Sequence, residues 1–405
     1  MAWMKLISAR NKKSIDKERK QMTESIGRQA GRQAGRQAGR QAGRQAGRQS
    51  GIELLRILAA TGVIVLHYNN SMIGGALNIG TGVNRGLLYF LEALNVCAVN
   101  VFVLINGFFD VENQKRDLMK PLRLIIQVML FNLAFYVLRV TAGSVALSAK
   151  GIIGSLNPAN WFITIYCGLY VISPFINVVL KRLSQRDYQL FLTISIVAFS
   201  AYPMLVDILE EFTQKTFNGL STIGMYGSQY GYTIVNFVLM YIIGAYIRRF
   251  GIKASSLKLL ITLLINTIIL AAWGLLDEML GYNMFDFVHV ERNAWEYCNP
   301  LVIFQAVIIF TLFIRMKFVN NAINKLAKAA FCVYLIHGYF IGYLKITQVV
   351  SMQNPLITIL HIAICCIGIY LIGFIINWIY SWVIKMIEKP VDRAWKRHRR
   401  YTVEL

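Results

Sequence analysis

Most of the stretch IELLRILAATGVIVLHY, residues 52–68, is apolar, yet it carries Glu53, Arg56 and His67. Arg56 and His67 are eleven residues apart, which on an α-helix is within about 20° of three full turns, and Glu53 precedes Arg56 by three residues. The three groups therefore share one face of a predicted helix, with about 16 Å of rise between Arg56 and His67. Such a face combines a histidine suited to general base catalysis with an arginine that can pair with a glutamate.

Charged side chains within an apolar span normally face the interior of a helix bundle or an aqueous cavity. We therefore expect Glu53, Arg56 and His67 to line an internal cavity. Two simpler interpretations stay open, in which Arg56 only reaches toward the lipid headgroups and His67 is an interfacial residue at the other end of the helix. Their shared face argues against both being incidental.

The composition around this helix is that of a membrane protein. Of the 405 residues, 56% are hydrophobic and only 15% are charged, whereas soluble domains have about 25% charged residues. Apolar runs of a length suited to crossing a bilayer recur along the chain. They cover residues 52–69, 86–108, 122–141, 161–180, 188–206, 231–247, 256–276, 299–314, 329–349 and 355–384. This pattern predicts an all-α integral membrane protein with about ten transmembrane helices that enclose a polar cavity.

Basic residues are distributed unevenly between the predicted loops. The loops 109–121, 181–187, 248–258 and 315–328 hold fourteen Lys or Arg, and the loops on the other side hold four. Because cytoplasmic loops carry the excess of positive charge, we expect both termini to be cytoplasmic. The net charge of +22 then reflects membrane topology and the basic termini, so no nucleic-acid partner is predicted.

The chain divides into three predicted segments. Residues 1–50 form a basic arm with GRQA repeats, which we expect to be disordered because its period of four has no apolar stripe. Two interpretations of this arm stay open: it lies on anionic lipid headgroups, or it is a repeat without function. Residues 51–387 form the membrane domain and residues 388–405 a basic cytoplasmic tail. The six cysteines have no C-x-x-C spacing, so neither a disulfide framework nor a metal site is predicted.

Five stretches, in the same order along the chain, resemble the acyltransferase-3 family of membrane acyltransferases. They are the Arg-x10-His of the first span, VNVFVLINGFF (99–109), KPLR (120–123), WFITIYCGLYVISPFIN (161–177) and CVYLIH (332–337). Together they cover roughly residues 51–385. Asn106 stands where the family commonly has Ser, and Lys120 where it has the first Arg of Arg-x-x-Arg. Asn keeps the hydrogen-bonding ability, and Lys keeps the charge but lacks the bidentate fork.

The resemblance implies transfer of an acyl group, usually acetyl, from cytoplasmic acyl-CoA to a hydroxyl of a surface polysaccharide or its lipid-linked precursor. It places the enzyme in the bacterial cytoplasmic membrane, with acetyl-CoA as donor substrate and no bound cofactor. His67 would act as general base or acyl relay, Arg56 would stabilise negative charge on the CoA phosphates or on an oxyanion, and Glu53 would orient Arg56. Direct transfer and a covalent acyl-enzyme both stay open.

Six further residues are candidates for binding the two substrates. Lys120 and Arg123 lie at the predicted cytoplasmic mouth, where CoA phosphates would arrive, and their alternative is plain positive-inside anchoring. The remaining candidates line the predicted substrate cavity: Asn106, Trp161, Tyr166 and His337. The alternative for Trp161 is an interfacial aromatic belt, and for His337 a hydrogen-bonded packing residue.

A second class of protein, a multi-span transporter of a lipid-linked sugar or small solute, also needs polar residues within the membrane. Transporters often contain an internal repeat, but residues 52–206 and 231–385 show no convincing similarity to each other. A basic pair near an intramembrane histidine also suits a nucleotide-bearing donor better than a carried solute. We therefore favour the enzyme, with an acyltransferase-like sensor as a third possibility.

Overall fold

The computed structural model describes residues 49–395, except for 71–72, 113–116, 118, 159, 214, 218, 221–228 and 282–291. Within these residues the chain is helical and contains no β-strand. Eight helical stretches are long and apolar enough to cross a membrane: Ser50–Asn69, Gly82–Asp110, Met119–Thr141, Trp161–Arg182, Gln185–Glu210, Ser256–Met279, Asn293–Ile314 and Pro355–Ile384. The predicted all-α membrane architecture is confirmed, whereas the count of ten spans and the side of the termini remain predictions. Most of the predicted arm (1–48) and the end of the predicted tail (396–405) lie outside the described residues.

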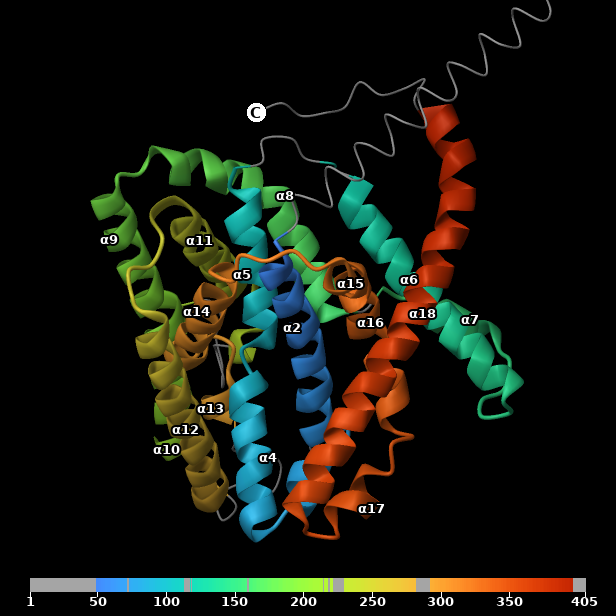
Figure 1. The fold of residues 1–405 in the computed structure, drawn as a ribbon, viewed down its shortest axis with the longest axis horizontal. Helices are drawn as coiled ribbons and strands as arrows, with labels where there is room; N and C mark the ends of the chain where they lie inside the picture. The colour runs from blue at the N-terminus through green and yellow to red at the C-terminus, as the bar shows by residue number, and fades with distance from the viewer. Residues whose placement is uncertain are drawn as a thin grey trace, which may run out of the picture.

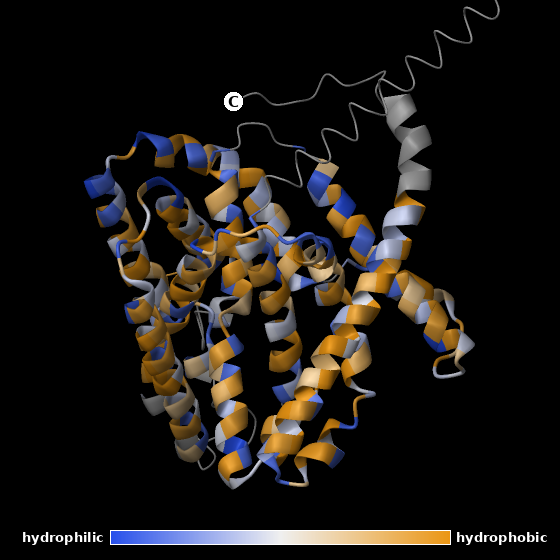
Figure 2. Ribbon diagram, viewed as in Figure 1, coloured by the Kyte–Doolittle hydropathy of each residue, from blue (hydrophilic) through white to orange (hydrophobic). Residues whose placement is uncertain are grey.

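The helices pack into one bundle (Figure 1). Four helices have more than half of their residues buried: α2 (Ser50–Asn69), α5 (Ala98–Asp110), α11 (Ile234–Phe250) and α16 (Ala330–Ile341). The helices that expose many apolar side chains are α6 (Met119–Thr141), α8 (Trp161–Arg182), α12 (Ser256–Gly281) and α18 (Pro355–Trp395). Figure 2 shows hydrophobic residues along the length of the bundle and hydrophilic residues concentrated toward its ends. This distribution is the one that a lipid environment requires.

The first helix of the domain, α2, lies inside this bundle. It packs against α4 (Gly82–Asn95), α5, α14 (Pro300–Ile314), α15 (Asn321–Leu326), α16 and α18. Neighbours on so many sides suit a sequence that is apolar nearly all round. The face of α2 that carries Glu53, Arg56 and His67 therefore lies within a helix surrounded by other helices.

Several predicted spans are interrupted. The predicted span 86–108 is divided into α4 and α5, with the break at Val96 and Cys97. The predicted span 188–206 contains α9 (Gln185–Ile196), a short π-helical turn (Val197–Ala201) and the start of α10 (Tyr202–Thr213). The predicted span 329–349 is divided between the end of η3 (Ala327–Ala329), α16, which ends at Ile341, and most of α17 (Ile346–Val350). Lys345, with a φ of 51°, directly precedes α17, so the chain does not continue as one helix. Shorter elements complete the fold: α3 (Ala76–Ile79), α7 (Ala149–Ser155), η2 (Gln229–Gly231) and α13 (Arg292–Trp295).

One end of the bundle is rich in arginine, and we call it the basic end. There α2 begins, and α5, α8, α11 and α14 finish (Figure 1). Arg249 donates hydrogen bonds to the carbonyl oxygens of Leu180 and Leu183, which joins α11 to the end of α8. Arg315 donates hydrogen bonds to the carbonyl oxygens of Ile252 and Ala254, in the connection before α12. This end is the one that the charge bias predicts to be cytoplasmic.

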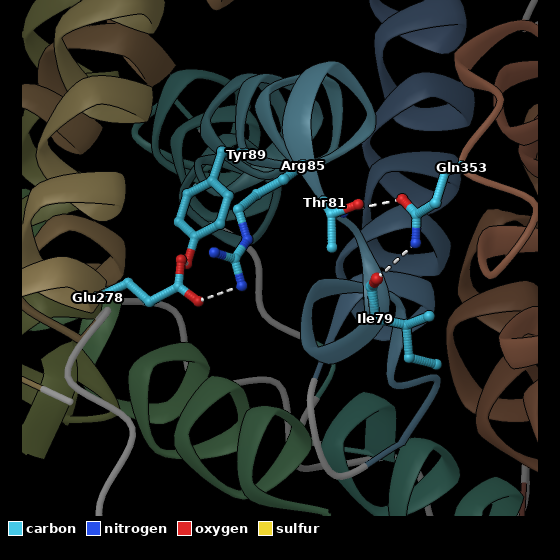
Figure 3. Close-up of polar contacts among 6 residues, drawn as sticks. All are labelled: Ile79, Thr81, Arg85, Tyr89, Glu278 and Gln353. Carbon is cyan, nitrogen blue, oxygen red and sulfur yellow. Dashed lines mark hydrogen bonds and ion pairs between the residues drawn. The ribbon is translucent and has the colours of Figure 1, made fainter.

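The opposite end of the bundle is tied by side chains from distant segments (Figure 3). Glu278 of α12 forms an ion pair with Arg85 at 2.9 Å and accepts a hydrogen bond from the Tyr89 hydroxyl at 2.7 Å. Gln353, between α17 and α18, donates to the Ile79 carbonyl and accepts from the Thr81 amide, both at 2.8 Å. These contacts fix α4 against α12 and anchor the turn that precedes α18.

Candidate active site

Glu53 and Arg56 lie in the first two turns of α2, near the basic end. Glu53 Oε1 accepts a hydrogen bond from Arg56 Nη1 at 2.8 Å. The Glu53 side chain is buried, and the Arg56 guanidinium is partly exposed, with its centre 5.9 Å from the centre of the Phe109 ring. The pairing that the three-residue spacing predicts is therefore present, and Glu53 holds the charge of Arg56 in place.

A cavity of about 280 Å³ lies beside Arg56. Five helices (α2, α5, α6, α8 and α16) and the η3 turn contribute its lining: Arg56, Phe102, Asn106, Lys120, Leu124, Phe162, Tyr166, Ala327, Lys328, Ala330, Phe331 and Tyr334. Among these described residues three side chains are cationic, none is acidic, and most of the others are apolar or aromatic. We call this space the inner cavity. A ligand suited to it has an anionic part near the cations and an apolar part along the aromatic wall.

Lys120 is held at the inner cavity by two tyrosines of α8. Its Nζ donates a hydrogen bond to the Tyr166 hydroxyl at 3.0 Å and lies 4.8 Å from the centre of the Tyr170 ring. Tyr166 and Tyr170 are four residues apart, so they present their rings on one face of α8. Lys120, predicted to bind acyl-CoA, and Asn106 and Tyr166, predicted to line the substrate cavity, are thus brought together with Arg56.

Arg123 and Trp161 do not line the inner cavity. Arg123 is one turn beyond Lys120 on α6, where it pairs with Asp117 at 3.2 Å and is about half exposed. Trp161 begins α8 and packs against Tyr232 and Tyr297, with ring centres 4.4 Å and 5.9 Å away. The neighbouring Phe162, and not Trp161, contributes to the aromatic wall, because successive helical residues point about 100° apart.

The two predicted histidines meet where α2 and α16 pack against each other. His67 of α2 and His337 of α16 have ring centres 4.5 Å apart in an edge-on arrangement, and His337 Nε2 lies 3.1 Å from His67 Nδ1. His67 Nδ1 is also 2.9 Å from the Val63 carbonyl oxygen, and His337 Nδ1 is 2.6 Å from the Tyr334 carbonyl oxygen. The sequence spacing of 270 residues gave no direct indication of this pair.

The two backbone carbonyls determine how the histidines carry their protons. A carbonyl oxygen only accepts, so Nδ1 must carry the hydrogen in both neutral rings. His337 Nε2 then has a lone pair, and the N–H of His67 Nδ1 is shared between the Val63 oxygen and that lone pair. The remaining nitrogen, His67 Nε2, is left unprotonated. This arrangement leaves His67 with one basic nitrogen available to a substrate.

Tyr334 connects the histidine pair with the inner cavity. Its side chain lines the cavity, its carbonyl accepts from His337, and its hydroxyl donates to Asn160 Oδ1 at 3.2 Å. His67 itself is not part of the lining of the inner cavity, in contrast to the expectation that it and Arg56 line one cavity together. The physical reason is the rise of about 16 Å that separates them along α2.

Lys328, Phe331 and Tyr334 were not among the residues singled out from the sequence. All three lie in or just before α16, and Tyr334 precedes His337 by three residues, which places both on nearly the same side of the helix. The motif CVYLIH therefore carried a second site residue, Tyr334. Lys328 was indicated only as one of many basic residues in a predicted inner loop.

Comparison with known proteins identifies the family to which the chain belongs. A family model described as an acyltransferase domain, that of the acyltransferase-3 family, matches residues 49–378. The chain therefore belongs to this family and is a multi-pass membrane acyltransferase, as the resemblance of its motifs predicted. No curated protein and no solved structure matches the chain.

Proposed function

We propose that this protein transfers an acetyl group from cytoplasmic acetyl-CoA to a hydroxyl group of a cell-surface polysaccharide or its lipid-linked precursor. The observation that carries the proposal is the inner cavity, which combines three cations with a long aromatic wall. CoA has the same division, with phosphates at one end and a slender arm that ends in the thioester. The proposed location is the bacterial cytoplasmic membrane, with the basic end inside.

Arg56, Lys120 and Lys328 would bind the CoA phosphates. The rise of about 16 Å along α2 favours this role for Arg56 over contact with an oxyanion, since the reacting carbonyl must lie near the base. Lys120 would exchange its hydrogen bond with the Tyr166 hydroxyl for a charge-assisted bond to phosphate, which is stronger. Arg123 would contribute only to the positive field around the mouth.

His67 would act as the general base. The hydroxyl oxygen of the acceptor attacks the thioester carbonyl carbon while its proton passes to His67 Nε2. The carbon–sulfur bond then breaks, and the proton is given to the leaving CoA thiolate, so that an ester and free CoA result. His337 would hold the His67 ring in the tautomer that leaves Nε2 unprotonated.

The decisive test uses membranes that contain the wild-type protein or His67→Ala at equal level, labelled acetyl-CoA and the envelope glycans of the host. We expect label in carbohydrate with the wild type and a loss of about 100-fold or more with His67→Ala. Label that survives the substitution would move the base to another residue. No transfer by the wild type to any glycan would contradict the proposed function.

A further inference from the structure

A second cavity, of about 310 Å³, lies between α6, α16 and the start of α8. We call it the outer pocket, because Asn132 follows Lys120 by twelve residues on α6, about 18 Å farther from the basic end. Its lining is formed by Val128, Phe131, Asn132, Asn160, Leu335, Gly338 and Tyr339. None of the residues assigned above to acyl-CoA or to proton transfer belongs to this lining.

The outer pocket presents neutral hydrogen-bonding groups. Tyr339 donates its hydroxyl hydrogen to Asn132 Oδ1 at 2.7 Å, and Asn132 Nδ2 donates to the Asn157 carbonyl at 3.2 Å. Asn160 Oδ1 accepts from the Ile163 amide at 3.1 Å and from the Tyr334 hydroxyl. Within the described part of the chain, both N–H groups of the Asn160 amide and one of Asn132 remain available to a ligand.

The chemistry of this lining suits a sugar. Amide donors and a phenol oxygen match the hydroxyl groups of a saccharide, and no described lining residue is charged, which favours an uncharged ring. The Tyr339 ring is stacked on Phe135, with ring centres 4.0 Å apart, so the wall that carries the hydroxyl is rigid. Asn132 lies in the middle of an apolar helix, where a polar side chain is costly and marks a functional site.

The outer pocket adjoins the inner cavity through one hydrogen bond. Tyr334 lines the inner cavity and Asn160 lines the outer pocket, and the Tyr334 hydroxyl donates to Asn160 Oδ1 at 3.2 Å. The backbone of Tyr334 in turn accepts from His337. A sugar in the outer pocket would therefore lie beside Asn160, which contacts a residue of the inner cavity lining.

A cation lies beyond the outer pocket on the same face of α6. Arg139 follows Asn132 by seven residues, which is within about 20° of two full turns and about 10 Å farther along the helix. It is exposed, is close enough to Tyr339 for an electrostatic interaction, and pairs with no acidic side chain within the described residues. Few residues of α6 are buried, so the pocket lies beside a helix whose other faces suit lipid.

From this arrangement we infer that the outer pocket binds the sugar of a lipid-linked saccharide, whose phosphate pairs with Arg139 and whose lipid chain stays in the bilayer beside α6. The inference rests on the proposed function for its connection with acyl transfer. It commits to a lipid-linked acceptor, because a lipid-free glycan would give Arg139 no phosphate to bind.

Gly338 offers a direct way to block the outer pocket. A Cβ at this position meets no atom within 4 Å, so a phenylalanine would extend into open space that includes the pocket. Gly342 is one turn farther along the chain, is equally open and exposed, and does not line the pocket. Gly338→Phe is therefore the test variant, and Gly342→Phe is the matched control.

The probes are a set of hexoses linked to a polyprenyl diphosphate and the same hexoses as free glycosides. Binding to the purified protein is measured by thermal stabilisation, and transfer by the KM values for sugar and for acetyl-CoA. For Gly338→Phe we expect loss of the stabilisation and at least a tenfold rise in the sugar KM, with the acetyl-CoA KM unchanged. Gly342→Phe should match the wild type in all three measurements.

Arg139→Gln tests the lipid-linked part of the inference. We expect about a tenfold weaker interaction with the diphosphate-linked sugars and no change for the free glycosides, since a charge-assisted hydrogen bond is lost. Equal effects on both probes, or unchanged sugar binding by Gly338→Phe, would overturn the inference. If the wild type binds the lipid-linked sugars through the pocket but transfers no acetyl group, the proposed function fails and the binding site stands.

Discussion

At the scale of single residues, the site depends on groups that hold one another in a fixed state. Glu53 fixes Arg56, Tyr166 and Tyr170 fix Lys120, and His337 fixes His67. The consequence is that supporting residues should affect activity only through the residue that they hold.

His337 is such a positioning residue in the proposed reaction. We expect His337→Ala to lower kcat by about tenfold to 100-fold with little change in either KM, because His67 loses the partner that fixes its tautomer. The double variant His67→Ala/His337→Ala should be no slower than His67→Ala alone. Steady-state kinetics of the four proteins measure this coupling, and additive losses would show that His337 acts independently of His67.

Lys120 and Arg123 form a matched pair for testing phosphate binding. Both are cations on the first turns of α6, but only Lys120 lines the inner cavity. We expect Lys120→Met to raise the KM for acetyl-CoA by about tenfold, because a charge-assisted hydrogen bond is lost. Arg123→Met should change it by less than about threefold. The reverse order in acetyl-CoA titrations would mean that the phosphates bind outside the inner cavity.

At the scale of elements, the contact between α5 and α11 brings two backbones unusually close. A Cβ on Gly107 would lie 2.1 Å from the Tyr241 carbonyl oxygen, and one on Gly244 would lie 2.3 Å from the Leu104 carbonyl oxygen. Small residues permit this approach, as they do at many helix contacts within membranes. The contact positions Asn106, the neighbour of Gly107, at the inner cavity.

Gly107→Ala should therefore destabilise the protein. The added methyl group forces α5 and α11 apart, at a cost of about 1–3 kcal/mol in the free energy of unfolding. The control is Gly368→Ala in α18, where a Cβ meets no atom within 4 Å. Thermal unfolding in detergent compares the two variants, and an equal Tm for Gly107→Ala and wild type would contradict the close packing.

At the scale of the whole molecule, the positions of the two cavities require a defined orientation in the membrane. The inner cavity lies beside Arg56, near the basic end, and acyl-CoA is a cytoplasmic donor in the proposed function. The loops predicted to be cytoplasmic carry fourteen of the eighteen Lys and Arg found in the loops between predicted spans. Both arguments place the basic end on the same side.

We accordingly expect the start of α2 and the end of α18 to face the cytoplasm. Single cysteines at Lys317, near the basic end, and at Gln353, at the opposite end, should differ in labelling by a membrane-impermeant maleimide. In intact cells only the Gln353→Cys variant should react, and both should react after lysis. The cysteine-free background replaces the six native cysteines. Labelling of Lys317→Cys in intact cells would reverse the orientation.

The sequence by itself determined the class of fold, the face shared by Glu53, Arg56 and His67, and membership in the acyltransferase-3 family. These conclusions depend on local properties, namely apolar run length, helical periodicity and short motifs, which each segment carries independently of the others. The pairing of Glu53 with Arg56 belongs to the same group, because one helical turn separates the two residues.

Only the tertiary structure decided which distant residues meet. The contact of His67 with His337, the addition of Lys328 and Tyr334 to the inner cavity, and the exclusion of Arg123 and Trp161 from it all depend on how helices pack and rotate about their axes. No period within a single helix encodes that rotation, since it is set by the side chains of the partners. The outer pocket was likewise invisible in the sequence, because α6, α8 and α16 form it together.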